Sequence, residues 1–176
     1  MTRPLVGIVM GSDSDLPVMR ESARVLEELG IASEMVISSA HRAPDRTAEY
    51  ARRAAERGLV VIIAGAGGAA HLPGVIAAYT SLPVIGVPIQ SGAINGVDAL
   101  YAIVQMPSGV PVAAVAINGA KNAGILAAQI IGAARPDVRA RIVAYKEKLA
   151  VQVSEKNALL ADLGIDGYLA RTGARG

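Results

Sequence analysis

Short apolar runs alternate along the chain with longer segments whose apolar residues have helical spacing. Five such runs, rich in branched apolar residues, occupy residues 5–10, 34–37, 59–64, 84–87 and 111–117, and no hairpin turn joins one run to the next. This alternation predicts parallel strands joined by right-handed crossovers, in a sheet with helices on both faces. Each run is apolar enough for a strand that is covered on both sides.

The segments between these runs predict six helices. They cover residues 14–29, 44–57, 69–79, 97–104, 120–134 and 136–163. Gly30 is a suitable stop for the first helix, and Pro44 occupies a permitted first-turn position in the second. The expected fold class is α/β, a three-layer αβα sandwich around a doubly wound, five-stranded parallel sheet. We expect the flavodoxin-like strand order 2-1-3-4-5 and an extra C-terminal helix.

A chain of 176 residues predicts one ordinary domain. Residues 1–134 form its α/β part, residues 135–163 its C-terminal helix, and residues 164–176 a tail. Residues 58–97 contain no Asp, Glu, Lys or Arg, but glycine and proline interrupt them too often for the roughly 20 apolar residues of a membrane span. A mean hydropathy of +0.42 is nevertheless high for a lone small domain. We infer that apolar surface is buried in a homo-oligomer.

Charge and cysteine content exclude several kinds of protein. The formal net charge is +2 and the basic residues are scattered, which gives no sign of a nucleic-acid surface. The chain has no cysteine, and two histidines do not by themselves make an ordinary zinc site. We expect a cytoplasmic protein without a bound metal.

Three polar or glycine-rich segments follow the first three predicted strands. They are GSDSD (11–15), SSAHRAP (38–44) and GAGGAAHLPG (65–74). Doubly wound sheets bind ligands beyond the carboxyl ends of their strands, where the strand order reverses. In the expected order this point lies between the first and third strands, so the three segments should meet in one cleft.

The first two segments offer groups that suit a phosphorylated sugar. Ser12, Ser39 and Arg42 provide hydroxyls and a bidentate cation for phosphate, whereas the carboxylate of Asp15 would repel phosphate and suits sugar hydroxyls. Two alternatives stay open. Ser12, Ser14 or Asp15 can serve only as a helix cap, and Arg42 can be a solvated surface residue.

The third segment contains GAGGAA, which formally satisfies the dinucleotide fingerprint G-x-G-x-x-A. It follows the third strand rather than the first, and the next strand ends without an acidic residue, which counts against NAD. Its glycines favour close approach of backbone amides to a small planar or anionic group. Tight packing of a helix on a strand is the alternative.

The two histidines lie in the second and third segments. We predict that His41 is catalytic, because an imidazole can give or take a proton near neutral pH and because Arg42 and the other two segments converge on it. His71 lies inside an apolar segment, where a lone histidine is more often structural.

Five motifs together give the chain a resemblance to a known family. They are GIVMGSDSD, SSAHRAPD, IIAGAGGAAHLPG, GVPIQS and AIVQMPSGVP, in the family's order within residues 4–160. The chain resembles the bacterial N5-carboxyaminoimidazole ribonucleotide mutases of purine biosynthesis. The resemblance implies an enzyme that moves a carboxyl group from the exocyclic nitrogen of this nucleotide to carbon 4 of its ring, without metal, ATP or biotin.

The resemblance also implies roles for individual residues. The family's catalytic histidine, matched by His41, assists loss of CO2 when protonated and takes the proton from carbon 4 when neutral. Ser12 and Arg42 match groups at the substrate phosphate, with Ser39 nearby, and Asp15 matches a group at the ribose. Gly67 to His71, including Gly68 and Ala69, match the wall that holds CO2 and excludes water, and Leu72 is a further expected substrate-binding residue.

Assembly is a further implication of the resemblance. The family is octameric, and its C-terminal helix packs on neighbouring subunits. Five other helices already cover the expected sheet, so we expect an apolar stripe on the last helix to find its partner on another subunit. The stripe consists of Val138, Ile142, Tyr145, Leu149 and Val153.

Two rival functions remain. An aminoimidazole ribonucleotide carboxylase of the same family would use free CO2 and yield the same product, although the VQMP segment resembles the mutase branch. A non-enzymatic receiver or flavin-binding module would need an aspartate after the third strand, where the chain has Gly65, or stacking aromatics, and the chain has no Phe or Trp.

Overall fold

The structure, a computed structural model, describes residues 3–173. It contains one five-stranded parallel sheet in the order β2-β1-β3-β4-β5, which confirms the expected topology. The strands are β1 (Val6–Met10), β2 (Ser33–Ile37), β3 (Val61–Gly67), β4 (Val84–Ile89) and β5 (Ala113–Ala114). The helices are η1 (Asp13–Asp15, a 3₁₀ turn), α1 (Leu16–Glu28), α2 (Pro44–Arg53), α3 (Leu72–Tyr79), α4 (Val97–Val104), α5 (Ala120–Ala134) and α6 (Pro136–Thr172).

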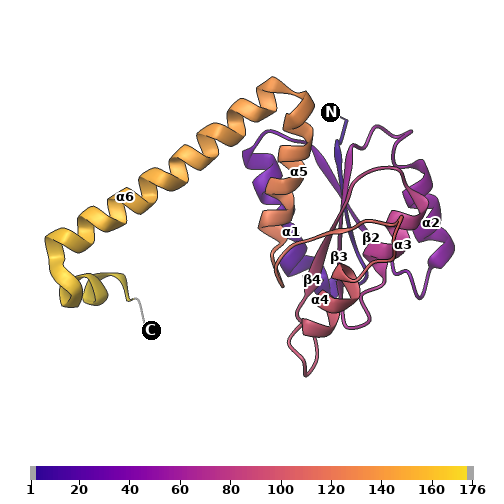
Figure 1. The fold of residues 1–176 in the computed structure, drawn as a ribbon, viewed down its shortest axis with the longest axis horizontal. Coiled ribbons are helices and arrows are strands. Elements are labelled where there is room, and N and C mark those ends of the chain that lie inside the picture. The colour runs from indigo at the N-terminus through magenta and orange to yellow at the C-terminus, as the bar shows by residue number, and fades with distance from the viewer. Residues whose placement is uncertain (1–2, 174–176) are drawn as a thin grey trace.

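Helices cover both faces of the sheet, so the three-layer prediction is confirmed (Figure 1). One face packs on α1 and α5, with the start of α6 against them, and the other packs on α2, α3 and α4. Alternate residues of β1 point to opposite faces of the sheet. Ile8 and Met10 belong to the core cluster under α1 and α5, and Val9 belongs to the core cluster under α2, α3 and α4. Burial on both faces is the reason that the central strands are continuous apolar runs.

β3 and β4 extend beyond their expected ends at residues 64 and 87, to Gly67 and Ile89, and β2 and β5 differ further from the expectation. β2 is an edge strand that helices cover incompletely, and Met35 and Ile37 are 37% and 47% exposed. The expectation that every run is covered on both faces is therefore wrong for β2. β5 contains only two residues instead of the seven expected over 111–117, although the backbone N–H groups of Val115 and Asn118 still bond to carbonyls of β4.

Several helix boundaries also differ. The expected helix at residue 69 begins only at Leu72, because Gly68 is left-handed (φ +58°) and the backbone N–H groups of Ala70 and His71 bond to carbonyls two residues earlier. The expected start at residue 14 falls inside η1, and α2 ends at Arg53 rather than at residue 57. None of the helices within residues 3–173 is both long and apolar enough to cross a membrane.

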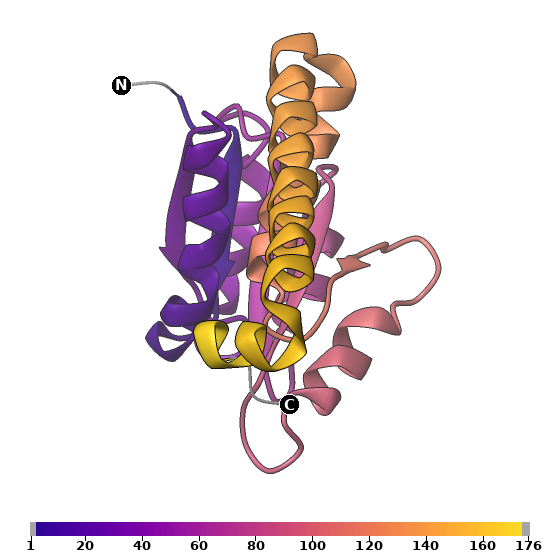
Figure 2. The same ribbon diagram turned by 90° about the vertical axis from the view of Figure 1, so that its left-hand side faces the viewer.

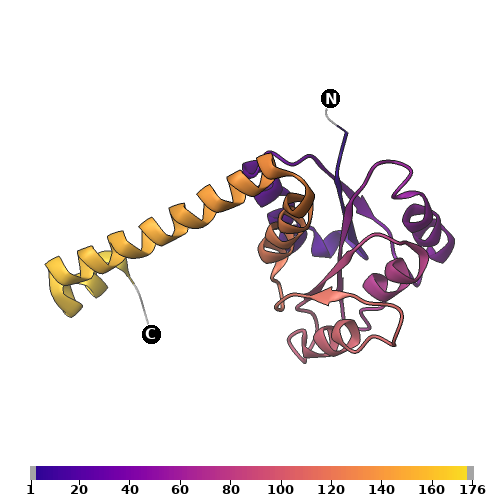
Figure 3. The same cartoon turned by 45° about the horizontal axis from the view of Figure 1, so that its top comes forward.

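Helix α6 packs on its own domain first and then leaves it (Figures 1 and 3). Val138, Ile142 and Tyr145 are buried in the core cluster that α1 and α5 also form, so these three members of the apolar stripe do not need a neighbouring subunit. Figure 2 faces this layer, with α1 and α6 toward the viewer. Leu149 and Val153 lie beyond it and are 42% and 66% exposed.

The end of α6 differs from the expected tail. The helix predicted to stop at residue 163 is interrupted at Gly164 (φ +66°, ψ 177°), a conformation that breaks the helical hydrogen bonds. A second helical segment then continues to Thr172. Residues 174–176 of the expected tail and residues 1–2 of the expected α/β part lie outside the described residues.

Candidate active site

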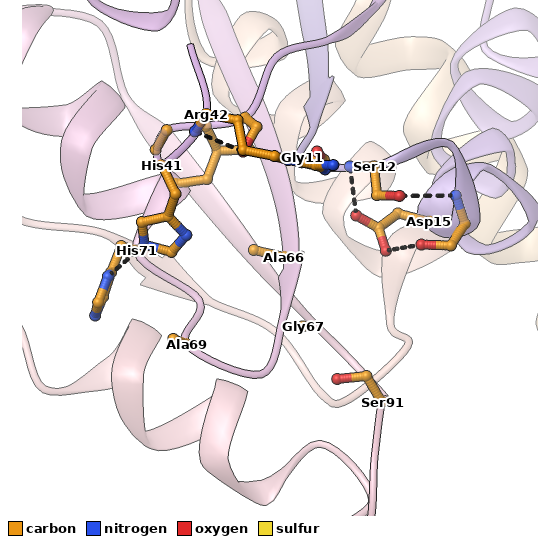
Figure 4. A pocket seen from close by; sticks show the side chains of 14 residues that line it. Gly11, Ser12, Asp15, His41, Arg42, Ala66, Gly67, Ala69, His71 and Ser91 are labelled. Carbon is orange, nitrogen blue, oxygen red and sulfur yellow. Dashed lines mark hydrogen bonds between the residues drawn. The ribbon is translucent and has the colours of Figure 1, made fainter. Parts of the chain in front are cut away.

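A cavity of about 380 Å³ opens at the carboxyl ends of the central strands (Figure 4). The three segments after β1, β2 and β3 all contribute to its walls, as the strand order predicts. Of the residues proposed for the site, Gly68 alone does not line the cavity; its left-handed backbone turns the chain from β3 toward α3. The lining residues that were expected are Ser12, Asp15, Ser39, His41, Arg42, Gly67, Ala69, His71 and Leu72.

The first wall is the turn after β1, which forms a reciprocal cap. The Ser12 hydroxyl accepts from the Ser14 N–H at 3.3 Å, and the Ser12 N–H donates to Asp15 Oδ2 at 3.1 Å. The Ser14 hydroxyl donates to Asp15 Oδ1 at 3.3 Å. The capping alternative is therefore realised for Ser12 and Asp15, and a binding role must use the hydrogen-bonding capacity that these side chains retain.

Asp15 is the buried carboxylate of this wall. Burial raises its pKa because the charged form loses water, and the nearby charge of Asp13 raises it further. Hydrogen bonds from Ser12, Ser14 and the Gly11 backbone lower the pKa but do not cancel the effect of burial. A carboxylate that is buried without full compensation is typical of a functional cleft.

The second wall is the segment after β2, where Arg42 lies against Ser39. Arg42 Nε is 3.5 Å from Ser39 Oγ, and Arg42 NH2 is 3.3 Å from the carbonyl oxygen of Gly11. Both distances are long for a guanidinium donor, and no carboxylate within residues 3–173 forms an ion pair with Arg42. The side chain is exposed and keeps donors available for an anion.

Two buried hydroxyls hold this segment in shape. Ser38 Oγ lies 2.8 Å from Thr47 Oγ1, and the two residues are 2% and 0% exposed. Thr47 Oγ1 also donates to the carbonyl of Ala43 at 3.2 Å, while the Ser38 N–H bonds to Met10 O at 2.8 Å. The loop is thus closed between the end of β2 and the first turn of α2, which directs His41 toward the cavity.

The two histidines meet at the cavity although they come from different segments (Figure 4). His41 Nε2 is 2.8 Å from His71 Nδ1, and the ring centroids are 4.9 Å apart at an angle of 83°. In a hydrogen bond between two imidazoles one nitrogen carries the proton and the other accepts it. His71, expected to be a lone structural residue, is instead exposed and paired with the predicted catalytic histidine.

The third wall is formed by the end of β3 and the turn that follows it. Gly67 lies so close to the end of β4 that an added Cβ would be 3.0 Å from the carbonyl oxygen of Ile89. Ala66 and Leu72 line the cavity from buried positions, and Ala69 from an exposed one. Small and apolar side chains therefore dominate this wall.

Metal-binding side chains do not cluster in the described part of the chain. Residues 3–173 contain no group of three or more His, Cys, Asp or Glu side chains that could hold a metal ion. The expectation of a protein that needs neither metal nor cofactor stays a prediction.

Comparison with known proteins identifies the family of this chain. The model of the AIR carboxylase family matches residues 5–152, a range that includes every residue lining the cavity. The chain belongs to the AIR carboxylase family.

Relatives of this AIR carboxylase family member match it over nearly its whole length. The N5-carboxyaminoimidazole ribonucleotide mutase of Thermotoga maritima is 60% identical over 94% of this chain and 97% of its own, and that of Mycobacterium tuberculosis is 60% identical over 96% of each. The phosphoribosylaminoimidazole carboxylase of Schizosaccharomyces pombe is 54% identical over 95% of this chain but only 30% of its own length. A crystal structure of Treponema denticola PurE has a TM-score of 0.81 at 31% identity, over 90% of this chain and 99% of that one.

Five lining residues of the family member's cavity were not proposed as site residues. Gly11, Ser14, Ala40 and Ala66 are sequence neighbours of expected residues, whereas Ser91 follows β4. Two features of the sequence indicated Ser91. This serine ends the GVPIQS motif, and β4 lies beside β3 in the expected strand order.

Proposed function

We propose that this AIR carboxylase family member is an N5-carboxyaminoimidazole ribonucleotide mutase of purine biosynthesis. The observation that carries the proposal is the His41–His71 pair at a cavity that also presents Arg42, Ser39 and Ser12. A proton-transfer group and anion-binding donors thus share one site. The two mutases that are 60% identical to this chain support the choice of reaction.

The proposed reaction moves a carboxyl group without a net change in protons. The carbamate bond between the exocyclic nitrogen and the carboxyl carbon breaks, the nitrogen takes a proton, and CO2 is released inside the cavity. The electron-rich carbon 4 of aminoimidazole ribonucleotide then attacks CO2 and loses its own proton. One proton is given and one is taken back.

We assign both proton transfers to His41. Its protonated ring donates to the nitrogen as the carbamate cleaves, and its neutral ring then takes the proton from carbon 4. His71 Nδ1, 2.8 Å from His41 Nε2, orients the ring and shares a proton with it. A group that starts and ends in the same protonation state can serve every turnover without help from solvent.

The other roles follow the chemistry of each wall. Arg42 and the hydroxyls of Ser12 and Ser39 bind the phosphate, because an exposed guanidinium without a carboxylate partner within residues 3–173 can form charge-assisted bonds to it. Asp15 accepts from ribose hydroxyls with the lone pairs that its cap leaves free. CO2 is enclosed by the lining residues Gly67, Ala69, His71 and Leu72, and Gly68 shapes the turn that carries them.

A carboxylase that uses free CO2 is the second candidate, because the phosphoribosylaminoimidazole carboxylase of S. pombe is 54% identical to this chain. Feeding the purified protein each substrate separately distinguishes the two reactions. We expect rapid conversion of N5-carboxyaminoimidazole ribonucleotide without bicarbonate, and slow conversion of aminoimidazole ribonucleotide with bicarbonate. The reverse preference would identify the carboxylase.

The proposal includes a cytoplasmic homo-oligomer, by family resemblance an octamer, that acts without metal or cofactor. Apolar side chains exposed on α6 beyond its contact with the domain support an assembly, since such a surface is normally covered. Light scattering of the purified chain measures the oligomer, and a monomer would contradict this part of the proposal. The exposed side chains are Leu149, Val151, Val153, Leu160, Ile165 and Leu169.

A further inference from the structure

Ser91 presents a hydroxyl to the cavity that none of the roles above uses. It lines the cavity on the side of Gly67 (Figure 4). A Cβ added to Gly67 would lie 2.7 Å from Ser91 Oγ, so only glycine allows this approach without a shift of the serine. The hydrogen bonds formed around it within residues 3–173 involve Gln90, Asn95 and Asn118 but not Ser91 Oγ.

Asn118 fixes the backbone immediately before Ser91. Its N–H donates to the carbonyl of Pro88 at 2.8 Å, and its side-chain Oδ1 accepts from the Gln90 N–H at 2.9 Å. A residue in a parallel strand bonds in this way to the two residues that flank its partner, but with its backbone N–H and C=O. The Asn118 side chain thus takes the place of a backbone carbonyl and extends the pairing of β4 to the edge of the cavity.

The backbone conformation of Asn118 supports its pairing with the end of β4. Its φ of +57° is left-handed, which asparagine tolerates better than most other residues. Asn118 Nδ2 donates to Gln90 Oε1 at 3.3 Å, and Gln90 Nε2 donates to Asn95 Oδ1 at 3.2 Å. These amides connect the β5–α5 turn with the end of β4, and the Gln90–Asn95 bond closes the loop that contains Ser91.

The position of Ser91 in the sheet separates it from the phosphate-binding donors. Three steps of about 4.8 Å lie between β2 and β4, so the ends of these strands are about 14 Å apart. Arg42 and Ser39 follow β2, whereas Ser91 follows β4 beside the wall assigned to CO2. The ring substituents of a nucleotide whose phosphate lies at Arg42 can therefore reach the side of the cavity that Ser91 lines.

We propose that Ser91 is a further substrate-binding residue whose hydroxyl donates to the carboxylate that the reaction moves, and that Asn118 is its positioning residue. The inference rests on the proposed function, which supplies this carboxylate. A hydroxyl bonds more strongly to an anionic carboxylate than to neutral CO2. Ser91 therefore binds the carboxylated nucleotides at the two ends of the reaction and contributes little to binding of the decarboxylated intermediate.

Binding measurements on Ser91→Ala test the proposal by calorimetry with two nucleotides. We expect affinity for 4-carboxyaminoimidazole ribonucleotide to fall about tenfold or more, as for the loss of a hydrogen bond to a charged group, while affinity for aminoimidazole ribonucleotide stays unchanged. Ser81→Ala is the matched control, because Ser81 is an exposed serine just before the opposite end of β4. This control should not change either affinity.

Variants of Asn118 test the positioning role. Asn118→Gly keeps the left-handed backbone accessible but removes the amide, so it should reproduce the carboxylate-selective loss, and adding Ser91→Ala should cause little further loss. Asn118→Asp retains an acceptor for the Gln90 N–H and should restore part of the affinity. A general loss of structure would instead weaken both nucleotides and would not be rescued.

The outcomes separate this inference from the proposed function. If the unaltered protein binds both nucleotides but Ser91→Ala weakens neither, or both equally, the Ser91 assignment is wrong and the mutase proposal stands. If the unaltered protein binds neither nucleotide, both proposals fail.

Discussion

Polar side chains gather at both ends of the sheet, and the two groups differ in how completely they pair. At the amino end the Tyr50 hydroxyl donates to Glu34 Oε1 at 2.8 Å, and Arg57 reaches both oxygens of the same carboxylate, at 2.8 and 3.0 Å. At the carboxyl end the partners of Arg42 within residues 3–173 are all neutral, at 3.3 to 3.5 Å. Similar residue types therefore complete the fold at one end and leave donors for a ligand at the other.

The pKa values of Glu34 and Asp15, the carboxylates at the two ends, shift in opposite directions. Burial favours a higher pKa for Glu34, but hydrogen bonds from Arg57 and Tyr50 outweigh it and hold the pKa below its ordinary value. For Asp15, burial outweighs the hydrogen bonds and the pKa lies above its ordinary value. Glu34 is thus stabilised as an anion by the fold, whereas Asp15 retains an electrostatic cost that a ligand can relieve.

The largest expected effect is at the carboxyl end, in His41→Asn. Turnover should fall roughly 10²- to 10⁴-fold, as expected for loss of a general acid–base group. The thermal unfolding midpoint should stay close to that of the unaltered protein, because His41 is exposed. Steady-state assays together with thermal unfolding measure both effects, and near-normal turnover would disprove the assignment of His41.

Arg42→Ala should weaken binding rather than proton transfer. We expect about tenfold or greater loss of affinity for the phosphorylated nucleotide and little loss for its dephosphorylated nucleoside, because a charge-assisted bond is lost only with the former. Calorimetry with both ligands measures the difference. Arg53→Ala is the control at the far end of α2, the helix that follows Arg42, since Arg53 is exposed and pairs with Glu49 at 3.6 Å. Equal losses for nucleotide and nucleoside would exclude a phosphate role for Arg42.

The sequence predicted the segments that form the cavity better than the contacts between them. The strand order and three of the cavity's segments followed from the alternation of apolar runs with helices, because buried parallel strands leave a strong local pattern. The His41–His71 contact was not predicted, since it depends on how two loops 30 residues apart meet across the sheet. Ser91 was missed because only the loops after the first three strands were placed in the cleft.

The C-terminal region shows a second limit of sequence reasoning. An apolar stripe on a helix shows that a face is covered but not whether the cover comes from the same chain. Val138, Ile142 and Tyr145 pack on their own domain, whereas Leu149 and Val153 do not. Likewise, Asn118 bonds to the end of β4 partly through its side chain, a contact that hydrophobic periodicity does not encode.

At the amino end, Glu34→Gln should change stability rather than catalysis. We expect a loss of about 1 kcal/mol in the free energy of unfolding at neutral pH, a modest value because the Glu34 and Arg57 side chains are 24% and 36% exposed. Since the folded-state pKa of Glu34 is depressed, its contribution is present above the ordinary pKa of 4.5 and is lost as pH falls through the folded-state value. Urea unfolding of the unaltered protein and of Glu34→Gln at several pH values measures how the difference between their free energies of unfolding decreases as pH falls.

The matched control for this variant is Glu49→Gln, which removes a carboxylate from a more exposed pair with Arg53. It should affect stability less than Glu34→Gln at neutral pH. A Glu34→Gln protein as stable as the unaltered one at neutral pH would mean that the paired cluster at the amino end contributes no net stability, and the contrast between the two ends would then rest on catalysis and binding alone.

The smallest expected change in stability, and one of opposite sign, is that of Asp15→Asn. Because the folded-state pKa of Asp15 is raised above its ordinary value of 3.8, folding is favoured when the carboxyl is protonated, and this contribution is lost as pH rises through the folded-state pKa. The amide stays neutral and can still accept the Ser12 N–H. The two proteins should therefore be equally stable at the lowest pH, and the variant slightly more stable at neutral pH. Urea unfolding across this range, with nucleotide titrations at neutral pH, tests the expectation that stability rises slightly while affinity falls. A variant that is less stable at neutral pH would show that the Ser12–Asp15 cap needs the charged carboxylate, so that this residue serves the fold as Glu34 does.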